Sequence, residues 1–166
     1  MTADATTADA TTAAATTGVL RRQFQLTIDC ADPDLLAHFW MAALGYVAQP
    51  PPEGHATWWD FWRSIGVPDD ENYDGLDSIV DPEGRSPRIW FQQVPERKSV
   101  KNRLHLDIHA SGGRANPLDV RRERVTAEAD RLVRLGASQV RELSGDGVDH
   151  FGITMADPEG NEFCIN

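Results

Sequence analysis

One order of sequence features occurs twice in this chain, and this duplication limits its fold more than any other feature. Residues 25–30 and 105–110 both alternate polar and apolar side chains with a period of two. Such alternation is typical of a β-strand with one packed face and one polar face. Each segment is followed by a helical pattern that ends at a Leu-Gly pair. The repeat therefore predicts two similar modules.

The expected helices carry recognisable start and stop signals. Asp32 before Pro33 suits an N-cap followed by proline at the first helical position. Apolar residues then recur at helical spacing up to Leu44, and Gly45 is placed to end the helix. The second helix is expected from about 118 to 135, with Gly136 after it.

A tetrapeptide, Asp-Pro-Glu-Gly, appears late in both copies, at residues 81–84 and 157–160. Asp, Pro and Gly at these positions favour a type I turn, and a last strand follows each turn, around 89–93 and 162–166. We therefore predict an α+β fold of two tandem βαβββ modules. They form a curved mixed sheet around a cleft, with the helices on the outside. The domain is expected over residues 19–166, with module 1 at about 19–97 and module 2 at about 101–166.

Composition excludes several classes of partner. The net charge of −10 disfavours nucleic acid and anionic membranes, and no apolar run is long enough to span a bilayer. Residues 1–18 are rich in Ala and Thr and are expected to be a disordered tail without a secretory signal. Two cysteines outside any C-x-x-C spacing favour a reduced, cytoplasmic protein. The excess of arginine over lysine suggests a bacterial source.

The strand pattern predicts which side chains line the cleft. Five apolar residues should face the helices: Leu26, Ile28, Leu104, Leu106 and Ile108. Alternate residues should share the concave face: Gln25, Thr27, Asp29, His105, Asp107, His109, Glu162, Cys164 and Asn166. A solvated sheet face is the alternative interpretation.

An aromatic run at residues 58–62 precedes an insertion, roughly 61–77, that we expect to be a loop. These side chains belong either to the core or a dimer interface, or to the wall of a ligand site.

His105 is the foremost candidate for metal binding or acid–base work, although strand histidines are commonly structural. Asp107 is placed to orient His105 or to act as a base. Cys164 has no activating neighbour in the sequence, so a cavity-lining role is favoured over a nucleophilic one. Arg103 and Lys101 are placed to hold a substrate anion, with surface charge as the alternative.

The stretch Gln-Gln-Val-Pro-Glu at 92–96 and the run from Lys101 to Asp107 resemble a known family. This is the glyoxalase, bleomycin-resistance and extradiol-dioxygenase (vicinal-oxygen-chelate) superfamily, and within it the glyoxalase-like domain group. The resemblance covers about residues 20–166. It implies a divalent metal held by the first and last strands of both modules. Carried over, the ligand positions fall on Gln25, Gln92 (or Phe91 in a shifted register), His105 and Cys164.

This ligand set departs from the family, whose last-strand positions usually hold glutamate. A thiolate at Cys164 favours zinc, and a set without a carboxylate lacks the base of a glyoxalase-type proton transfer. We therefore do not expect true glyoxalase I activity. The resemblance implies a binding or weakly catalytic protein that uses its cleft, without the usual metal, to hold a small, partly aromatic or oxygen-rich molecule. Ligand contacts are expected at Gln25, Thr27, Trp90, Gln92, Arg103 and His109.

Two alternatives remain open. One is a metal-dependent lyase, isomerase or dioxygenase that uses zinc, nickel, manganese or iron, with His105 and Asp107 as catalytic residues. The other is a structural or regulatory module. A homodimer is expected, as is common in the family.

Overall fold

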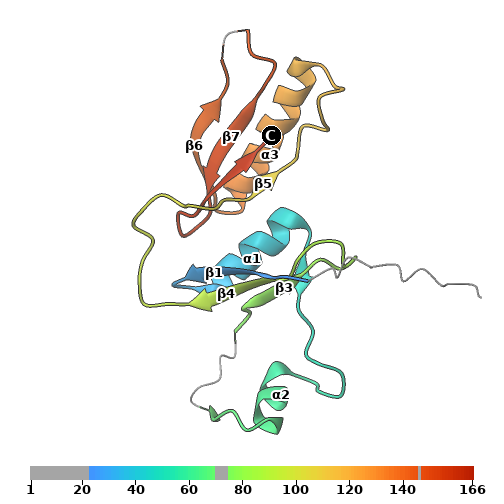
Figure 1. Ribbon diagram of the computed structural model, residues 1–166, viewed down its shortest axis with the longest axis vertical. Helices are drawn as coiled ribbons and strands as arrows, with labels where there is room; N and C mark the ends of the chain where they lie inside the picture. The colour runs from blue at the N-terminus through green and yellow to red at the C-terminus, as the bar shows by residue number, and fades with distance from the viewer. Residues whose placement is uncertain (1–22, 70–74, 146) are drawn as a thin grey trace, which may run out of the picture.

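The computed structural model describes residues 23–69, 75–145 and 147–166, and it contains two four-stranded mixed sheets with three helices (Figure 1). The predicted tail, residues 1–18, lies outside the described residues. Within the described part of the chain, no helix has the length and apolar character needed to cross a membrane.

The first sheet has the order β1-β4-β3-β2. Its elements are β1 (Leu26–Cys30), α1 (Pro33–Leu44), β2 (Val47–Ala48), β3 (Ser78–Val80) and β4 (Ile89–Gln93). β1 pairs in parallel with β4, whereas β3 is antiparallel to both of its neighbours, β2 and β4. This is the predicted βαβββ module.

The second sheet repeats the arrangement in the order β5-β8-β7-β6. Its elements are β5 (Asp107–Ile108), α3 (Leu118–Arg134), β6 (Ser138–Leu143), β7 (Gly152–Ala156) and β8 (Glu162–Ile165). β5 pairs in parallel with β8, as β1 does with β4. The duplication read from the sequence is therefore confirmed in the topology.

The capping signals of α1 act as the sequence predicts. The Asp32 side chain accepts a hydrogen bond from the Leu35 N–H at 3.0 Å, and Pro33 opens the helix. Gly45 ends it with a φ of 72°, a left-handed conformation that glycine adopts without steric cost.

The insertion contains a helix that the sequence analysis did not anticipate. α2 (Trp58–Ser64) begins at Thr57, whose hydroxyl accepts a hydrogen bond from the Asp60 N–H. None of its residues is buried, and Figure 1 shows it standing apart from both sheets. Trp58 and Trp62 stack on one another with ring centroids 5.7 Å apart. This excludes a place in the core for the run and leaves the dimer interface and the ligand-site wall as its alternatives.

The two modules share one hydrophobic core. Buried side chains come from α1, α3 and both sheets: Leu36, Phe39, Trp40, Ile79, Ile89, Phe91, Val125, Leu132, Ile153, Met155, Phe163 and Ile165. α1 links the modules, because the Trp40 ring lies 5.1 Å from the Phe163 ring of β8 in an edge-on arrangement. Trp40 Nε1 also donates to Asp157 at 3.3 Å.

Two expectations about the start of the second module need correction. Leu104 is 86% exposed and belongs to the linker between the modules, so it does not face a helix. β5 covers only Asp107–Ile108, so His105 precedes the strand and does not lie within it. The alternation at 105–110 is read correctly, but only its central pair of residues finds ladder partners in β8.

Candidate functional site

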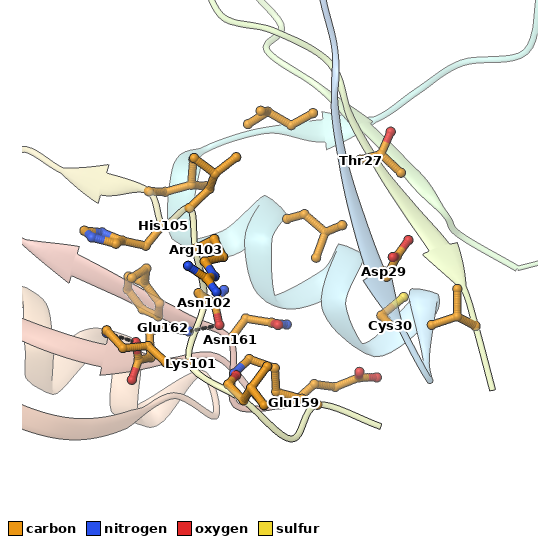
Figure 2. A pocket seen from close by; sticks show the side chains of 18 of the residues that line it. Thr27, Asp29, Cys30, Lys101, Asn102, Arg103, His105, Glu159, Asn161 and Glu162 are labelled. Atoms are coloured by element: carbon orange, nitrogen blue, oxygen red, sulfur yellow. Dashed lines mark hydrogen bonds and ion pairs between the residues drawn. The ribbon is translucent and has the colours of Figure 1, made fainter. Parts of the chain in front are cut away.

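A cavity of about 890 Å³ lies between the edge strand β1 and the linker that joins the modules. Trp40 and Phe163 form part of its apolar wall. Its polar lining comes from β1, the linker and the β7–β8 turn region: Thr27, Asp29, Glu96, Arg97, Lys98, Ser99, Lys101, Asn102, Arg103, His105, Glu159, Asn161 and Glu162. Figure 2 shows the β1 residues on one side and the linker and second module on the other. This is a space of the size that small-molecule sites occupy.

The linker brings positive charge to this cavity. Lys101 forms an ion pair with Glu162, and its ammonium lowers the pKa of that carboxyl. Lys98 donates to the Val100 carbonyl. Arg103 lines the cavity as the sequence analysis placed it, but Asp29 and Glu96 line it too, so its walls carry both signs of charge.

Three potential metal ligands meet on the polar face of the second sheet. One donor atom from each of His105, Asp107 and Cys164 lies within 4.8 Å of the others. The ladder explains this, because Asp107 lies directly opposite Cys164, and His105 is two residues before Asp107 on the same face. His105 Nδ1 is 3.2 Å from Asp107 Oδ1. His105 also lines the cavity, so the cluster adjoins it.

Thr154 lies next to the sulfur of Cys164. It lies opposite Cys164 on β7, is buried, and places its hydroxyl 3.7 Å from Cys164 Sγ. Sequence reasoning missed Thr154, although the polar residue in the otherwise apolar Gly152–Ala156 strand was the available signal.

His109 lies away from this cluster. Its Nδ1 is 2.7 Å from Asn166 Oδ1 at the far end of β5 and β8. The structure therefore separates His109 from His105, in agreement with the spacing of four residues along an extended chain.

The predicted residues of the first module form a different polar network. Arg88 donates to Gln25 Oε1 at 2.7 Å, to Gln49 Oε1 at 2.5 Å and to Ser78 Oγ at 2.6 Å. Burial lowers the pKa of Arg88, and the nearby Asp77 carboxylate partly offsets this effect. Gln25 is thus held beside Arg88.

Gln92 and Trp90 occupy the same face further along β4. Gln92 lies opposite Asp29, and Trp90 lies opposite Thr27 and donates its Nε1–H to Asp77. Gln25 is four residues from Asp29 along an extended chain, about 13 Å at roughly 3.3 Å per residue. The structure does not bring Gln25 and Gln92 to one site, and neither lines the cavity.

The two ladders also constrain the alignment of the repeats, because Gln25 with His105 and Gln92 with Cys164 cannot both be equivalent pairs. Gln92 pairs with Asp29, and Cys164 pairs with Asp107, so matching Gln92 with Cys164 makes Asp29 and Asp107 equivalent positions. Thr27, not Gln25, then corresponds to His105. The first module presents Thr27, Asp29 and Gln92 where the second presents His105, Asp107 and Cys164. Only the second module therefore combines an imidazole, a carboxylate and a thiol.

Both cysteines are free thiols, as the sequence analysis favoured. Cys30 is 2% exposed, and its Sγ lies 3.6 Å from the Gln92 carbonyl oxygen. Burial raises the pKa of Cys30 to about 12, and the carboxylates of Glu159 and Asp32 add to the increase. Cys164 is only half-buried.

Comparison with known proteins agrees with the duplicated fold. The sequence pattern of the glyoxalase-like domain matches residues 25–166. The chain belongs to the glyoxalase-like domain family. It is thereby a member of the vicinal-oxygen-chelate superfamily that the residues at 92–107 resemble. No curated protein matches the sequence.

Solved structures share the fold at low sequence identity. A glyoxalase/bleomycin resistance protein/dioxygenase family enzyme from Burkholderia phytofirmans PsJN has a TM-score of 0.51 at 15% identity, covering 86% of this chain and 94% of that chain. The fosfomycin resistance protein FosX from Mesorhizobium loti has a TM-score of 0.51 at 9% identity, with 89% and 92% covered.

A mutant FosX from Listeria monocytogenes, in complex with Mn(II) and 1S,2S-dihydroxypropylphosphonic acid, has a TM-score of 0.54 at 10% identity, with 89% and 90% covered. Identities this low establish a common architecture and no common activity.

Proposed function

We propose that this glyoxalase-like protein binds a small, oxygen-rich molecule in the inter-module cavity, beside a soft-metal centre formed by His105, Asp107 and Cys164. The convergence of three donor atoms within 4.8 Å of one another carries the proposal. The cavity that His105 lines supports it, since it provides a space of about 890 Å³ next to the cluster.

The donor set fits a divalent ion of intermediate softness. An imidazole, a carboxylate and a thiolate are all zinc ligands, and three protein ligands with one open position are typical of catalytic zinc sites. The thiol disfavours magnesium. If Asp107 keeps its contact with His105 Nδ1, then Nε2 is left for the ion, and Asp107 orients the ring. When bound, the ion supplies a Lewis acid for a ligand oxygen.

Metal content tests this proposal. Untagged wild-type protein should bind about one equivalent of zinc, and His105→Ala and Cys164→Ser should each lose most of it, because each removes one of three donors. His38→Ala is the matched control, since His38 is exposed on α1 and contacts only Asp34 in the described part of the chain. A protein that takes up no zinc, nickel, manganese or iron would exclude the metal centre.

A second candidate is a metal-dependent lyase, isomerase or dioxygenase, and the position of Asp107 favours it. The sequence argument against proton transfer was the missing carboxylate, and the structure sets Asp107 within 3.2 Å of His105. Asp107 is thus placed to accept a proton from a bound substrate. Turnover by metal-loaded protein that falls in Asp107→Asn, with the metal content retained, would support this reading. Equal turnover in both proteins would exclude Asp107 as the base.

We also propose a cytoplasmic, bacterial homodimer. Free thiols agree with a reducing compartment. The aromatic side chains of α2 support the dimer, because the structure leaves them outside the core and away from the cavity. Light scattering on size-exclusion fractions tests it: a monomer mass at high protein concentration would exclude the dimer.

A further inference from the structure

The sulfur of Cys164 is the one member of the donor cluster that changes its chemistry under oxidation. We propose that Cys164 is a site of oxidative modification and that its oxidation by a peroxide empties the metal centre. This inference rests on the proposed function, because it concerns the same three donors. It goes further by making occupancy of the site depend on the oxidation state of one residue.

Accessibility separates the two cysteines of the chain. Cys30 lines the inter-module cavity but is only 2% exposed. Burial raises the pKa of its thiol to about 12, so little of the thiolate that reacts with peroxide is present there. Cys164 alternates with the buried Phe163 and Ile165 on β8 and points to the opposite, polar face of the sheet. Its neighbours on that face, His105 and Asp107, are both exposed. Cys164 is therefore the more exposed of the two cysteines, and a small polar oxidant reaches it from the polar face of the sheet.

The environment of the sulfur also suits this chemistry. The Thr154 hydroxyl at 3.7 Å and the polar groups of His105 and Asp107 surround it, so the uptake of a polar oxygen atom places no new polar group in an apolar core. The same oxygen on Cys30 would lie among buried apolar side chains and carry a desolvation cost.

The reaction balances with a hydroperoxide as oxidant. The thiolate sulfur attacks one oxygen of hydrogen peroxide, an S–O bond forms, and the O–O bond breaks. Sulfur loses two electrons, and hydroxide leaves, which solvent protonates to water. The product is a sulfenic acid, Cys–SOH. The neutral sulfenic acid lacks the thiolate charge that held the metal, so the ion dissociates from the two remaining donors.

No second protein thiol is at hand to convert this product to a disulfide. The chain has only two cysteines, and Cys30 is buried in the first module with its sulfur turned to the Gln92 carbonyl. Recovery therefore requires a low-molecular-weight thiol. One molecule displaces water to form a mixed disulfide, and a second releases the reduced Cys164.

The test uses the full chain loaded with zinc. Hydrogen peroxide is added with a 1,3-dione that traps sulfenic acids, a chromogenic chelator follows released zinc, and peptide masses locate the trapped adduct. We expect the adduct on Cys164 and not on Cys30, zinc release in step with it, and zinc rebinding after excess dithiothreitol in a sample without the trap. Cys164→Asp keeps an anionic donor that peroxide does not oxidise, so its zinc release should be roughly tenfold slower. Cys30→Ala should respond like wild type.

The outcomes separate the two proposals. Failure of the reduced wild type to take up zinc overturns the proposed metal centre and, with it, the redox control. Zinc uptake followed by peroxide treatment without release, or release that proceeds equally in Cys164→Asp, overturns the redox control alone. Trapping on Cys30 in preference to Cys164 also overturns it. The wild-type peptide masses require no variant, so a misfolded substitution does not decide the result.

Discussion

Glu159 is predicted to stabilise the protein through a charged polar contact between the two modules. Its carboxylate accepts hydrogen bonds from the Ala31 N–H, at 2.8 and 3.0 Å to its two oxygens, and from the Asp32 N–H at 2.6 Å. These two N–H groups precede α1, so the carboxylate also lies at the positive end of the helix dipole. The contact joins the turn before β8 to the chain that follows β1.

The magnitude follows from the two donors that lose their partner in Glu159→Ala. A hydrogen bond to a charged group contributes about 1.5–3 kcal/mol when solvent cannot replace it. Ala31 and Asp32 are exposed, so water restores part of the loss. We expect the free energy of unfolding to fall by about 2 kcal/mol. At roughly 2–4 °C per kcal/mol for a chain of this size, Tm should fall by about 4–8 °C.

The duplicated turn supplies a matched control. Glu83 occupies the same place in the first Asp-Pro-Glu-Gly turn, yet its exposed carboxylate pairs only with Arg85 among the described residues. Glu83→Ala should therefore change the free energy of unfolding by less than about 0.5 kcal/mol. Urea unfolding followed by tryptophan fluorescence measures both variants. Equal losses in Glu83→Ala and Glu159→Ala would refute the claim that Glu159 joins the modules.

Two further predictions concern stability. Trp40→Ala should lower the free energy of unfolding by about 3–5 kcal/mol, because Trp40 is 2% exposed and packs on Phe163. Trp62→Ala on α2 should lower it by less than about 1 kcal/mol. Urea unfolding compares the two variants, and similar losses would contradict the placement of α2 outside the core. Backbone N–H groups, that of Glu83 first, lower the pKa of Asp81 below its ordinary 3.8. The Asp81 carboxylate therefore stabilises the folded protein above pH 3.8, and this contribution disappears as the pH falls through the lowered pKa. Asp81→Asn should therefore destabilise the protein at pH 7 and flatten the fall in stability below pH 3.8. Urea unfolding curves at several pH values measure this, and a variant that keeps the wild-type pH dependence would show that Asp81 does not contribute in this way.

The first aspartate of the turn motif has a lowered pKa in the first module and a raised pKa in the second. The sequence alone does not predict this difference. Both aspartates accept hydrogen bonds from the backbone of their turns. Asp81 is solvated, so those bonds lower its pKa. Asp157 is buried against Trp40, and burial raises its pKa despite bonds from Asn161 and Trp40. The type I turn was predictable from four residues. The burial of one copy depends on α1, more than a hundred residues away.

The fold was predictable because its determinants are local. Strand periodicity, the Asp32 and Gly45 caps and the repeated turn all act within a few residues. The pairing of Asp107 with Cys164 was not, because it depends on the register between β5 and β8. Aligning the repeats by their alternating pattern matched Gln25 with His105. A shift of two residues preserves that alternation, so the pattern alone does not fix which residues of the two strands are equivalent.

The core alternative for the aromatic run was excluded for a related reason. Tryptophan-rich segments usually pack in a core, but α2 lies in an insertion that neither sheet covers. The sequence likewise did not predict the contact between Glu159 and the first module, because its partners lie far away in the sequence. Such contacts depend on tertiary placement and leave no local pattern.

X-ray absorption at the zinc edge of the reduced, zinc-loaded protein tests the central claim most directly. The account predicts one sulfur neighbour at about 2.3 Å, together with nitrogen and oxygen neighbours near 2.0–2.2 Å, and loss of the sulfur shell in Cys164→Ser. A wild-type spectrum with nitrogen and oxygen neighbours alone would contradict a metal centre at His105, Asp107 and Cys164.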